Sequence, residues 1–118
     1  MKLIGHFING REVSSSSKRT ADVFNPATGE VQRKVSMGLA SELDDAVEKA
    51  KECQPAWAAT NPQKRARVIM KFIDLLHRDM DELATVLSSE HGKTIPDAKG
   101  DIIRAVSYTH LRAHETAS

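Results

Sequence analysis

The chain has 118 residues, of which 40% are hydrophobic and only 4% aromatic, so we expect one small domain with a mainly aliphatic core. Its formal net charge of +1 gives no electrostatic reason to expect binding to nucleic acid or to an anionic membrane. No apolar run approaches the ~20 residues that span a bilayer, and no signal peptide is expected. The single cysteine, Cys53, excludes an internal disulfide and fits a cytoplasmic protein.

The first 35 residues have the pattern of short strands joined by tight turns. Asn9 and Gly10 form the dipeptide that favours a two-residue hairpin, because both positions tolerate positive φ. Residues 25–29 predict a second turn, since their proline fixes φ and their glycine readily adopts a left-handed conformation. Apolar and polar residues then alternate over residues 31–35, as in a half-buried strand. We therefore expect an antiparallel β unit over residues 5–35.

Two amphipathic helices are expected to follow. From Ser41 the apolar residues recur at helical spacing, and Ser41 with Asp44 resembles a capping box. Pro55 is expected to end or kink this first helix. Asn61 followed by Pro62 predicts a new helix, with an N-cap and then proline at the first helical position.

The second helix is expected to continue past a cap at Asp79 or Asp81 and to end at Gly92, where glycine supplies the left-handed C-terminal residue. A third helix is expected to begin near Pro96 and to be cut short soon after Arg104. Strands followed by amphipathic helices indicate an α/β fold.

Several possible sites have simpler structural explanations. Residues 92–94 read Gly-Lys-Thr like the end of a phosphate-binding loop, but Leu87 stands where that motif needs glycine, so a helix cap is favoured. Cys53 lies late in its helix, where the dipole disfavours a thiolate, so a structural role is favoured over a nucleophile. His110 and His114 have zinc-compatible spacing but lack the internal glutamate and a third ligand, so we interpret the pair as chance.

A basic stretch on the second helix has no interleaved aromatic residues, which favours a solvated helix face over a nucleic-acid surface; it comprises Lys64, Arg65, Arg67 and Lys71. Trp57 is most simply a packing anchor for the first helix. Arg104, taken on its own sequence context, would be an ordinary surface residue.

The order of several short motifs resembles the N-terminal portion of aldehyde dehydrogenases over residues 3–104. These motifs are Phe-Ile-Asn-Gly, Asn-Pro-Ala-Thr-Gly-Glu-Val, Ala-Trp-Ala, Glu-Leu-Ala and Glu-x-Gly-Lys-Thr. Residues 5–8 and 92–101 resemble most the CoA-acylating methylmalonate-semialdehyde dehydrogenase subfamily. The resemblance implies that the β unit and the helices form part of a Rossmann-like NAD-binding domain.

The resemblance also implies a cytoplasmic, dimeric or tetrameric enzyme that converts a small semialdehyde, CoA and NAD to propionyl-CoA, as in valine or inositol catabolism. In this family a cysteine thiolate attacks the aldehyde, and NAD accepts the hydride. The nucleophilic cysteine, the oxyanion-hole asparagine and the NAD contacts all fall beyond residue 118 in family order, and Cys53 does not match that cysteine. We therefore expect no catalytic and no cofactor-binding residue in this chain, and no activity from it alone.

Arg104 is the one site residue that the resemblance implies here. The pattern Gly-Asp-x-x-Arg over residues 100–104 places it where these enzymes carry an arginine suited to the substrate's carboxylate. A planar guanidinium holds a carboxylate through two parallel charge-assisted hydrogen bonds. Some family members also hold a monovalent cation, at positions that match Val23, Phe24 and Glu90, but packing explains these residues equally well and no metal is predicted.

Residues 105–118 depart from the family pattern, because they are polar and lack a sustained helical stripe. They resemble translated adapter sequence, and we interpret them as a non-native, disordered tail after a native segment of residues 1–104. Two alternatives stay open. In the first, the chain is a piece of another aldehyde dehydrogenase, of the succinate-semialdehyde or betaine-aldehyde type. In the second, it is an autonomous small α/β interaction module without enzymatic activity.

Overall fold

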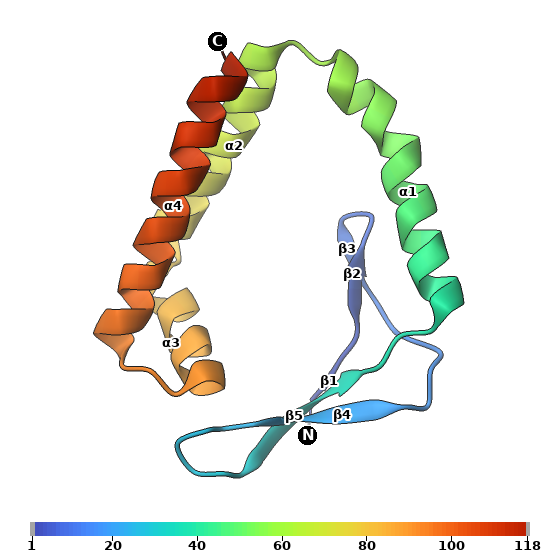
Figure 1. The fold of residues 1–118 in the computed structure, drawn as a ribbon, viewed down its shortest axis with the longest axis vertical. Helices are drawn as coiled ribbons and strands as arrows, with labels where there is room; N and C mark the ends of the chain where they lie inside the picture. Colours follow the sequence, from blue (N-terminus) through green and yellow to red (C-terminus); the bar gives the residue numbers. More distant parts are fainter. Residues whose placement is uncertain (1, 118) are drawn as a thin grey trace. The chain divides into compact units, whose positions relative to one another are not determined.

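The computed structural model describes the backbone of residues 2–117 and the side chains of residues 2–109. Within that part of the chain, five short strands precede four helices, which confirms the predicted order of strands before helices (Figure 1). The chain divides after Ala58 into two compact units, which we call unit 1 and unit 2. Unit 1 holds all the strands and most of the first helix, and unit 2 holds the other three helices.

The predicted hairpin is confirmed. Strands β2 (His6–Ile8) and β3 (Arg11–Val13) pair antiparallel and are joined by a two-residue turn. Asn9 has φ 55° and Gly10 has φ 77°, so both turn residues adopt the positive φ that this kind of turn requires.

The second sheet corrects one detail of the predicted β unit. Strands β4 (Thr20–Phe24) and β5 (Val31–Ser36) pair antiparallel as expected, but β1 (Leu3–Ile4) pairs with β5 in parallel and the hairpin forms a sheet of its own. The chain leaves β1 through Gly5, where an added Cβ would lie 2.6 Å from the carbonyl oxygen of Val13. Only glycine permits this close backbone approach.

Helix α1 (Ala40–Ala59) passes through Pro55, so the helix does not end there, and of the two expected outcomes only the kink stays a prediction. Proline removes one intrahelical hydrogen bond, but the neighbouring glutamate, glutamine and alanine residues are strong helix formers. No residue of α1 is buried, and Trp57 is 45% exposed rather than packed as an anchor.

In unit 2, the start of α2 (Pro62–Arg78) confirms the sequence prediction. The side chain of Asn61 accepts a hydrogen bond of 2.8 Å from the backbone N–H of Gln63, and Pro62 occupies the first helical position. Helix α3 (Met80–His91) ends as expected at Gly92, which is left-handed with φ 87°.

The buried apolar residues of the described chain lie in unit 2. They are Ala66 and Ile73 on α2, Ala84 on α3, and Ala98 and Val106 on α4 (Ile95–Ala117). Helices α2 and α4 lie side by side in Figure 1, and alanine at the contacts lets the helices approach closely. In unit 1 the only buried residue among those described is Ser36.

Helix α4 differs from the expected short helix and disordered tail, because its helical backbone continues to Ala117. The residues after Arg104 include neither glycine nor proline, so nothing local interrupts the helix. Val106 is 8% exposed and extends the buried row that Ala98 begins eight residues earlier. The non-native origin of residues 105–118 stays a prediction.

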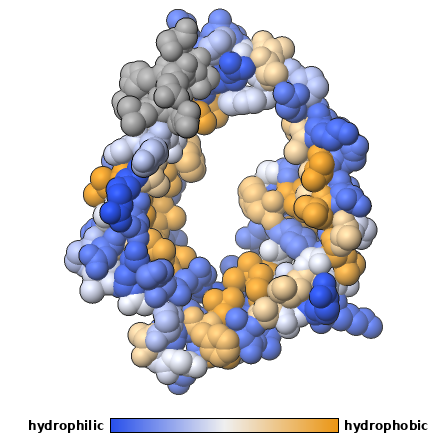
Figure 2. All heavy atoms as spheres, in the orientation of Figure 1, coloured by the Kyte–Doolittle hydropathy of each residue, from blue (hydrophilic) through white to orange (hydrophobic). Residues whose placement is uncertain are grey.

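Large apolar side chains lie on the surface of both units, where they appear orange in Figure 2. Phe7 and Leu43 in unit 1 are 73% and 65% exposed, and Val68 and Phe72 in unit 2 are 54% and 50% exposed. Among residues 2–117, no helix has the length and apolar character needed to cross a membrane.

Candidate functional site

Arg104 lies on α4 with its side chain 74% exposed. Its Nη2 group donates a hydrogen bond to Oδ1 of Asp101, one turn earlier on the same helix. The other carboxylate oxygen of Asp101, Oδ2, accepts a hydrogen bond from Nζ of Lys93. One carboxylate therefore bridges two cations, and we call Lys93, Asp101 and Arg104 the bridge cluster.

The loop between α3 and α4 fixes the backbone at Lys93. The N–H of Gly92 donates to the carbonyl oxygen of Ser88 at 2.8 Å, and the Ser88 hydroxyl donates to the carbonyl oxygen of Lys93 at 2.6 Å. The Lys93 side chain is 21% exposed and that of Asp101 is 30% exposed, so this half of the cluster is partly shielded from solvent.

The bridge cluster keeps its carboxylate ionised. Hydrogen bonding from Lys93, and secondly from Arg104, lowers the pKa of Asp101 below its usual range. At neutral pH the two cations and the one carboxylate leave a net charge of +1 on the cluster. This charge suits a small anionic ligand.

The same loop excludes the phosphate-binding interpretation of residues 92–94. Gly92 is the left-handed cap of α3, and its N–H is used within that cap. Thr94 immediately precedes α4, and its carbonyl oxygen accepts the first hydrogen bond of that helix from the N–H of Ala98 at 2.9 Å. A phosphate cradle needs free backbone N–H groups that converge after a strand, and this loop joins two helices.

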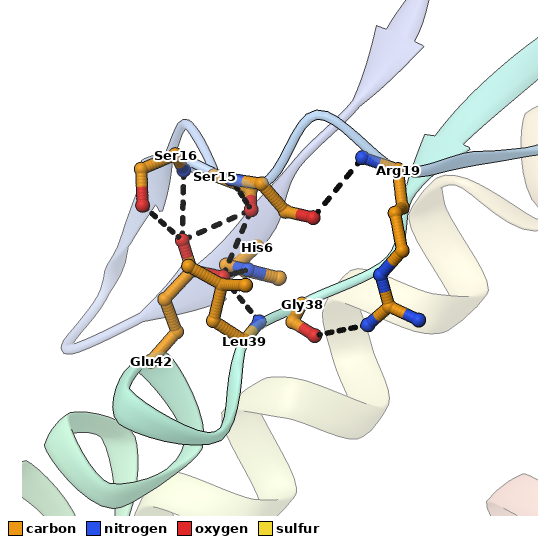
Figure 3. Close-up of polar contacts among 8 residues, drawn as sticks. His6, Ser15, Ser16, Arg19, Gly38, Leu39 and Glu42 are labelled. Atoms are coloured by element: carbon orange, nitrogen blue, oxygen red, sulfur yellow. Dashed lines mark hydrogen bonds and ion pairs between the residues drawn. The ribbon is translucent and has the colours of Figure 1, made fainter.

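Unit 1 holds a second polar cluster, centred on the carboxylate of Glu42 (Figure 3). The ring Nε2 of His6 donates to it at 2.8 Å, and the Ser15 hydroxyl lies 2.8 and 2.9 Å from its two oxygens. Ser16 donates through its backbone N–H at 2.8 Å and its hydroxyl at 3.1 Å, and the N–H of Leu39 donates at 3.0 Å. We call this set of residues the Glu42 cluster.

The Glu42 cluster joins three parts of unit 1: the hairpin, the serine-rich connection and the first turn of α1. Hydrogen bonding from His6 is the largest of the causes that hold the pKa of Glu42 far below its usual range, followed by the N–H groups of Leu39 and Ser16. An ionised carboxylate is the form that accepts this many donors, so its role is to fasten these segments together.

The Glu42 cluster also corrects the predicted cap. The helix begins at Ala40, so Leu39 is the N-cap and Glu42, not Asp44, is the acidic residue at the third helical position. The capping box based on Ser41 is therefore wrong by two residues. Leucine is a poor N-cap residue, so no local sequence signal identifies Glu42.

Beside the Glu42 cluster, unit 1 has an open, mainly apolar groove of about 550 Å³. Its lining includes Phe7 and Ile8 from the hairpin and Leu43 and Ala46 from α1. Cys53 is exposed further along α1, where it borders a smaller groove rather than packing in a core.

The remaining sequence candidates are distributed over both units. Among the described side chains, no three His, Cys, Asp or Glu residues lie close enough to hold a metal ion. Val23 lies in β4 of unit 1 and Glu90 in α3 of unit 2. On the basic face of α2, Arg65 is half-buried and the other members are exposed; those are Lys64, Arg67 and Lys71. His110 and His114 lie outside the described side chains.

Comparisons with known proteins place this architecture. The sequence model of the aldehyde dehydrogenase family matches residues 13–118, and the chain belongs to this family. Its strands and helices match the N-terminal, NAD-binding region of these enzymes. The matched range includes residues 105–118.

Within the family, the chain is similar to methylmalonate-semialdehyde dehydrogenases. It is 41% identical over 100 residues to a probable acylating methylmalonate-semialdehyde/malonate-semialdehyde dehydrogenase of Dictyostelium discoideum. The aligned region covers 85% of this chain and 19% of the relative. The Homo sapiens enzyme of that name is 37% identical over 117 residues, covering 93% of this chain and 22% of the relative.

A solved structure agrees with these relatives. The crystal structure of a Sinorhizobium meliloti 1021 protein assigned as a methylmalonate-semialdehyde dehydrogenase, complexed with NAD, has a TM-score of 0.93 and 55% identity to this chain. The match covers 96% of this chain and 23% of the other. The chain therefore spans about a fifth of the length of the relatives it matches.

Proposed function

We propose that this chain is the N-terminal part of an NAD-dependent, CoA-acylating methylmalonate-semialdehyde dehydrogenase, in which Arg104 binds the carboxylate of the substrate. The observation that carries the proposal is the exposed guanidinium of Arg104 at the edge of a cluster with net positive charge. Guanidinium is the side-chain group best matched to a carboxylate, because two of its N–H groups donate in parallel.

The names of the relatives support a carboxylated substrate. The Dictyostelium and human relatives are named for methylmalonate and malonate semialdehydes, and a Pseudomonas aeruginosa relative, 41% identical over 106 residues, is named a malonate-semialdehyde dehydrogenase. A plant family member with 31% identity and a TM-score of 0.85 was crystallised with its reaction product succinate. Each of these compounds carries a carboxylate besides the aldehyde carbon or its oxidation product.

The covalent chemistry is proposed to reside outside this chain. Cys53 is exposed late in α1, where the helix dipole disfavours the thiolate that a nucleophile needs. The loop at residues 92–94 does not fit a nucleotide phosphate, so we propose that the NAD contacts also come from the rest of the enzyme. NAD would supply the hydride acceptor and CoA the group that receives the acyl product.

On this proposal the chain is inactive alone and contributes substrate recognition and structural support. We propose a cytoplasmic, dimeric or tetrameric full-length enzyme, although the Dictyostelium and human relatives are named mitochondrial. An assay of the purified 118-residue chain for semialdehyde-dependent reduction of NAD checks this point. Turnover by the chain itself would contradict it.

The test of Arg104 uses the full-length enzyme that contains this segment. Arg104→Met is expected to lower kcat/KM for methylmalonate semialdehyde by about 100-fold, since it removes two charge-assisted hydrogen bonds worth roughly 1.5 kcal/mol each. The loss for propanal, which lacks the carboxylate, is expected to be far smaller. Malonate and succinate semialdehydes, assayed alongside, rank the substrates.

Arg78→Met is the matched control. Arg78 is also an exposed arginine of unit 2 paired with an aspartate, with hydrogen bonds of 2.9 Å to both oxygens of Asp79. Its loss is expected to affect carboxylated and simple aldehydes alike. Equal losses on both substrates for Arg104→Met would refute the proposed role of Arg104.

A further inference from the structure

The bridge cluster raises the question of what Asp101 does to Arg104. A carboxylate beside a substrate-binding arginine has two opposite effects. It competes with the substrate for the guanidinium, which weakens binding, or it holds the guanidinium in place, which strengthens binding. The distribution of hydrogen bonds and exposure within the cluster decides between these effects.

Lys93 interacts with the Asp101 carboxylate more strongly than Arg104 does. It is the partly shielded partner, with its side chain 21% exposed against 74% for Arg104, and its hydrogen bond is the largest contributor to the lowered pKa of Asp101. An ion pair with less solvent around it is screened less by water and salt. Lys93 therefore offsets most of the negative charge of Asp101, and the exposed guanidinium of Arg104 still attracts an anion.

Arg104 also keeps most of its donors. A guanidinium has five N–H donors, and within residues 2–109 that of Arg104 hydrogen-bonds to the single oxygen Oδ1 of Asp101. The contact restrains a long side chain that would otherwise sample many conformations, at a cost of about 2 kcal/mol in rotamer entropy when it is fixed. A restrained arginine with free donors is prepared to bind an anion.

We propose that Asp101 is a positioning residue, which holds Arg104 in place for the substrate carboxylate while Lys93 offsets the negative charge of Asp101. The inference rests on the proposed function of Arg104. It adds Asp101 and Lys93 to the residues that serve substrate binding. Lys93 reaches Asp101 across the loop between α3 and α4, eight positions away, and Asp101 reaches Arg104 along one helix turn, three positions away.

A second ion pair in the same unit provides a matched control. Nζ of Lys99 lies 2.7 Å from Oδ1 of Asp81, which joins α4 to α3 without involving Arg104. Removing this pair tests what the loss of an ion pair in this unit does by itself. Any effect of Asp101 through Arg104 must exceed that of Asp81 and must depend on the substrate carboxylate.

The experiment measures KM and kcat of the full-length enzyme with methylmalonate semialdehyde and with propanal, for Asp101→Asn, Asp101→Glu, Lys93→Gln and Asp81→Asn. Asp101→Asn is expected to raise KM for the carboxylated substrate by about three- to tenfold, more than for propanal, with kcat changed less. Lys93→Gln is expected to raise the same KM by about two- to threefold, because Asp101 then neutralises Arg104 more fully. Asp101→Glu keeps the charge and is expected to restore part of the loss.

Each other outcome overturns the inference. A lower KM in Asp101→Asn would show that Asp101 competes with the substrate. Unchanged kinetics, or equal changes for both substrates as expected from Asp81→Asn, would reduce Asp101 to a structural role. Arg104→Met separates the two proposals: if it discriminates between the substrates and Asp101→Asn does not, only the positioning role fails, whereas if Arg104→Met does not discriminate, the proposed function itself fails.

Discussion

Different interactions stabilise each of the two units internally. Unit 1 is fastened by the ionised Glu42 carboxylate and its donors, and Ser36 is its only buried residue among those described. Unit 2 is held by a row of small buried apolar side chains between its helices, while its charged bridge cluster lies nearer the surface. The Glu42 carboxylate accepts its donors only while it is ionised, whereas the buried row of unit 2 depends on the size and shape of its side chains. We therefore expect a change of pH to affect unit 1 and a loss of side-chain volume to affect unit 2.

Loss of packing in unit 2 is expected to have the largest effect. Ile73, the largest of the buried apolar residues, is 8% exposed, so Ile73→Ala should leave a cavity and cost about 2–4 kcal/mol in the free energy of opening of α2 and α4. Amide hydrogen exchange of the 118-residue chain measures this cost for each helix. Exchange within unit 1 is expected to be unchanged.

Val68→Ala is the control, because Val68 lies on the same helix but is 54% exposed. It should cost well under 1 kcal/mol in the isolated chain. A similar loss of stability at both positions would mean that the burial of Ile73 does not stabilise unit 2.

The Glu42 cluster predicts a smaller effect confined to unit 1. Glu42→Gln should speed exchange at the start of α1 by roughly tenfold, because an amide cannot serve all the donors that the carboxylate accepts. Glu48→Gln is the control, since Glu48 lies on the same helix in a loose exposed pair with Lys51 at 3.8 Å. Equal protection in both variants would remove Glu42 from its fastening role.

The same cluster predicts a pH dependence of definite sign. The pKa of Glu42 is lower in the folded chain than in the unfolded one, so its contribution to stability is present above about pH 4.5, the unfolded value, and is lost as the pH falls from there toward the folded pKa. Protection at the start of α1 should therefore decline below that pH in the wild-type chain and not in Glu42→Gln. A parallel decline in both would assign the effect to other carboxylates.

Two glycines of unit 2 give the smallest predicted effects, with opposite signs. Gly92→Ala should cost about 1 kcal/mol, because φ 87° strains any side chain. Gly100→Ala, inside α4 where an added Cβ meets no atom within 4 Å, should stabilise the helix by about 0.5–1 kcal/mol. Circular dichroism of the two variants checks the signs, and a gain from Gly92→Ala would contradict the left-handed cap.

Features written in neighbouring residues could be predicted from the sequence. The hairpin turn at Asn9, the helix start at Asn61 and the helix end at Gly92 each depend on the backbone preferences of one or two residues. The structure confirms all three. The order of strands and helices follows from the same local signals and from hydrophobic periodicity.

Features that depend on distant residues could not be predicted in this way. The donors of Glu42 come from positions up to 36 residues away, and the parallel pairing of β1 with β5 joins Leu3 to Lys34. Two expectations for α1 fail: Pro55 does not end the helix, because the residues around it are strong helix formers, and Trp57 is 45% exposed. Helical spacing alone does not show whether an apolar side chain finds a packing partner. For the candidate site, the resemblance identified Arg104, but only the structure relates it to Lys93 through Asp101.

The central claim, that Arg104 recognises a carboxylate, is tested most directly by a crystal structure of the full-length enzyme with methylmalonate bound. We expect the guanidinium of Arg104 to donate two hydrogen bonds of about 2.7–2.9 Å to one carboxylate, while Asp101 still contacts Lys93. A ligand whose carboxylates both bind away from Arg104, with the arginine in contact only with Asp101, would contradict it.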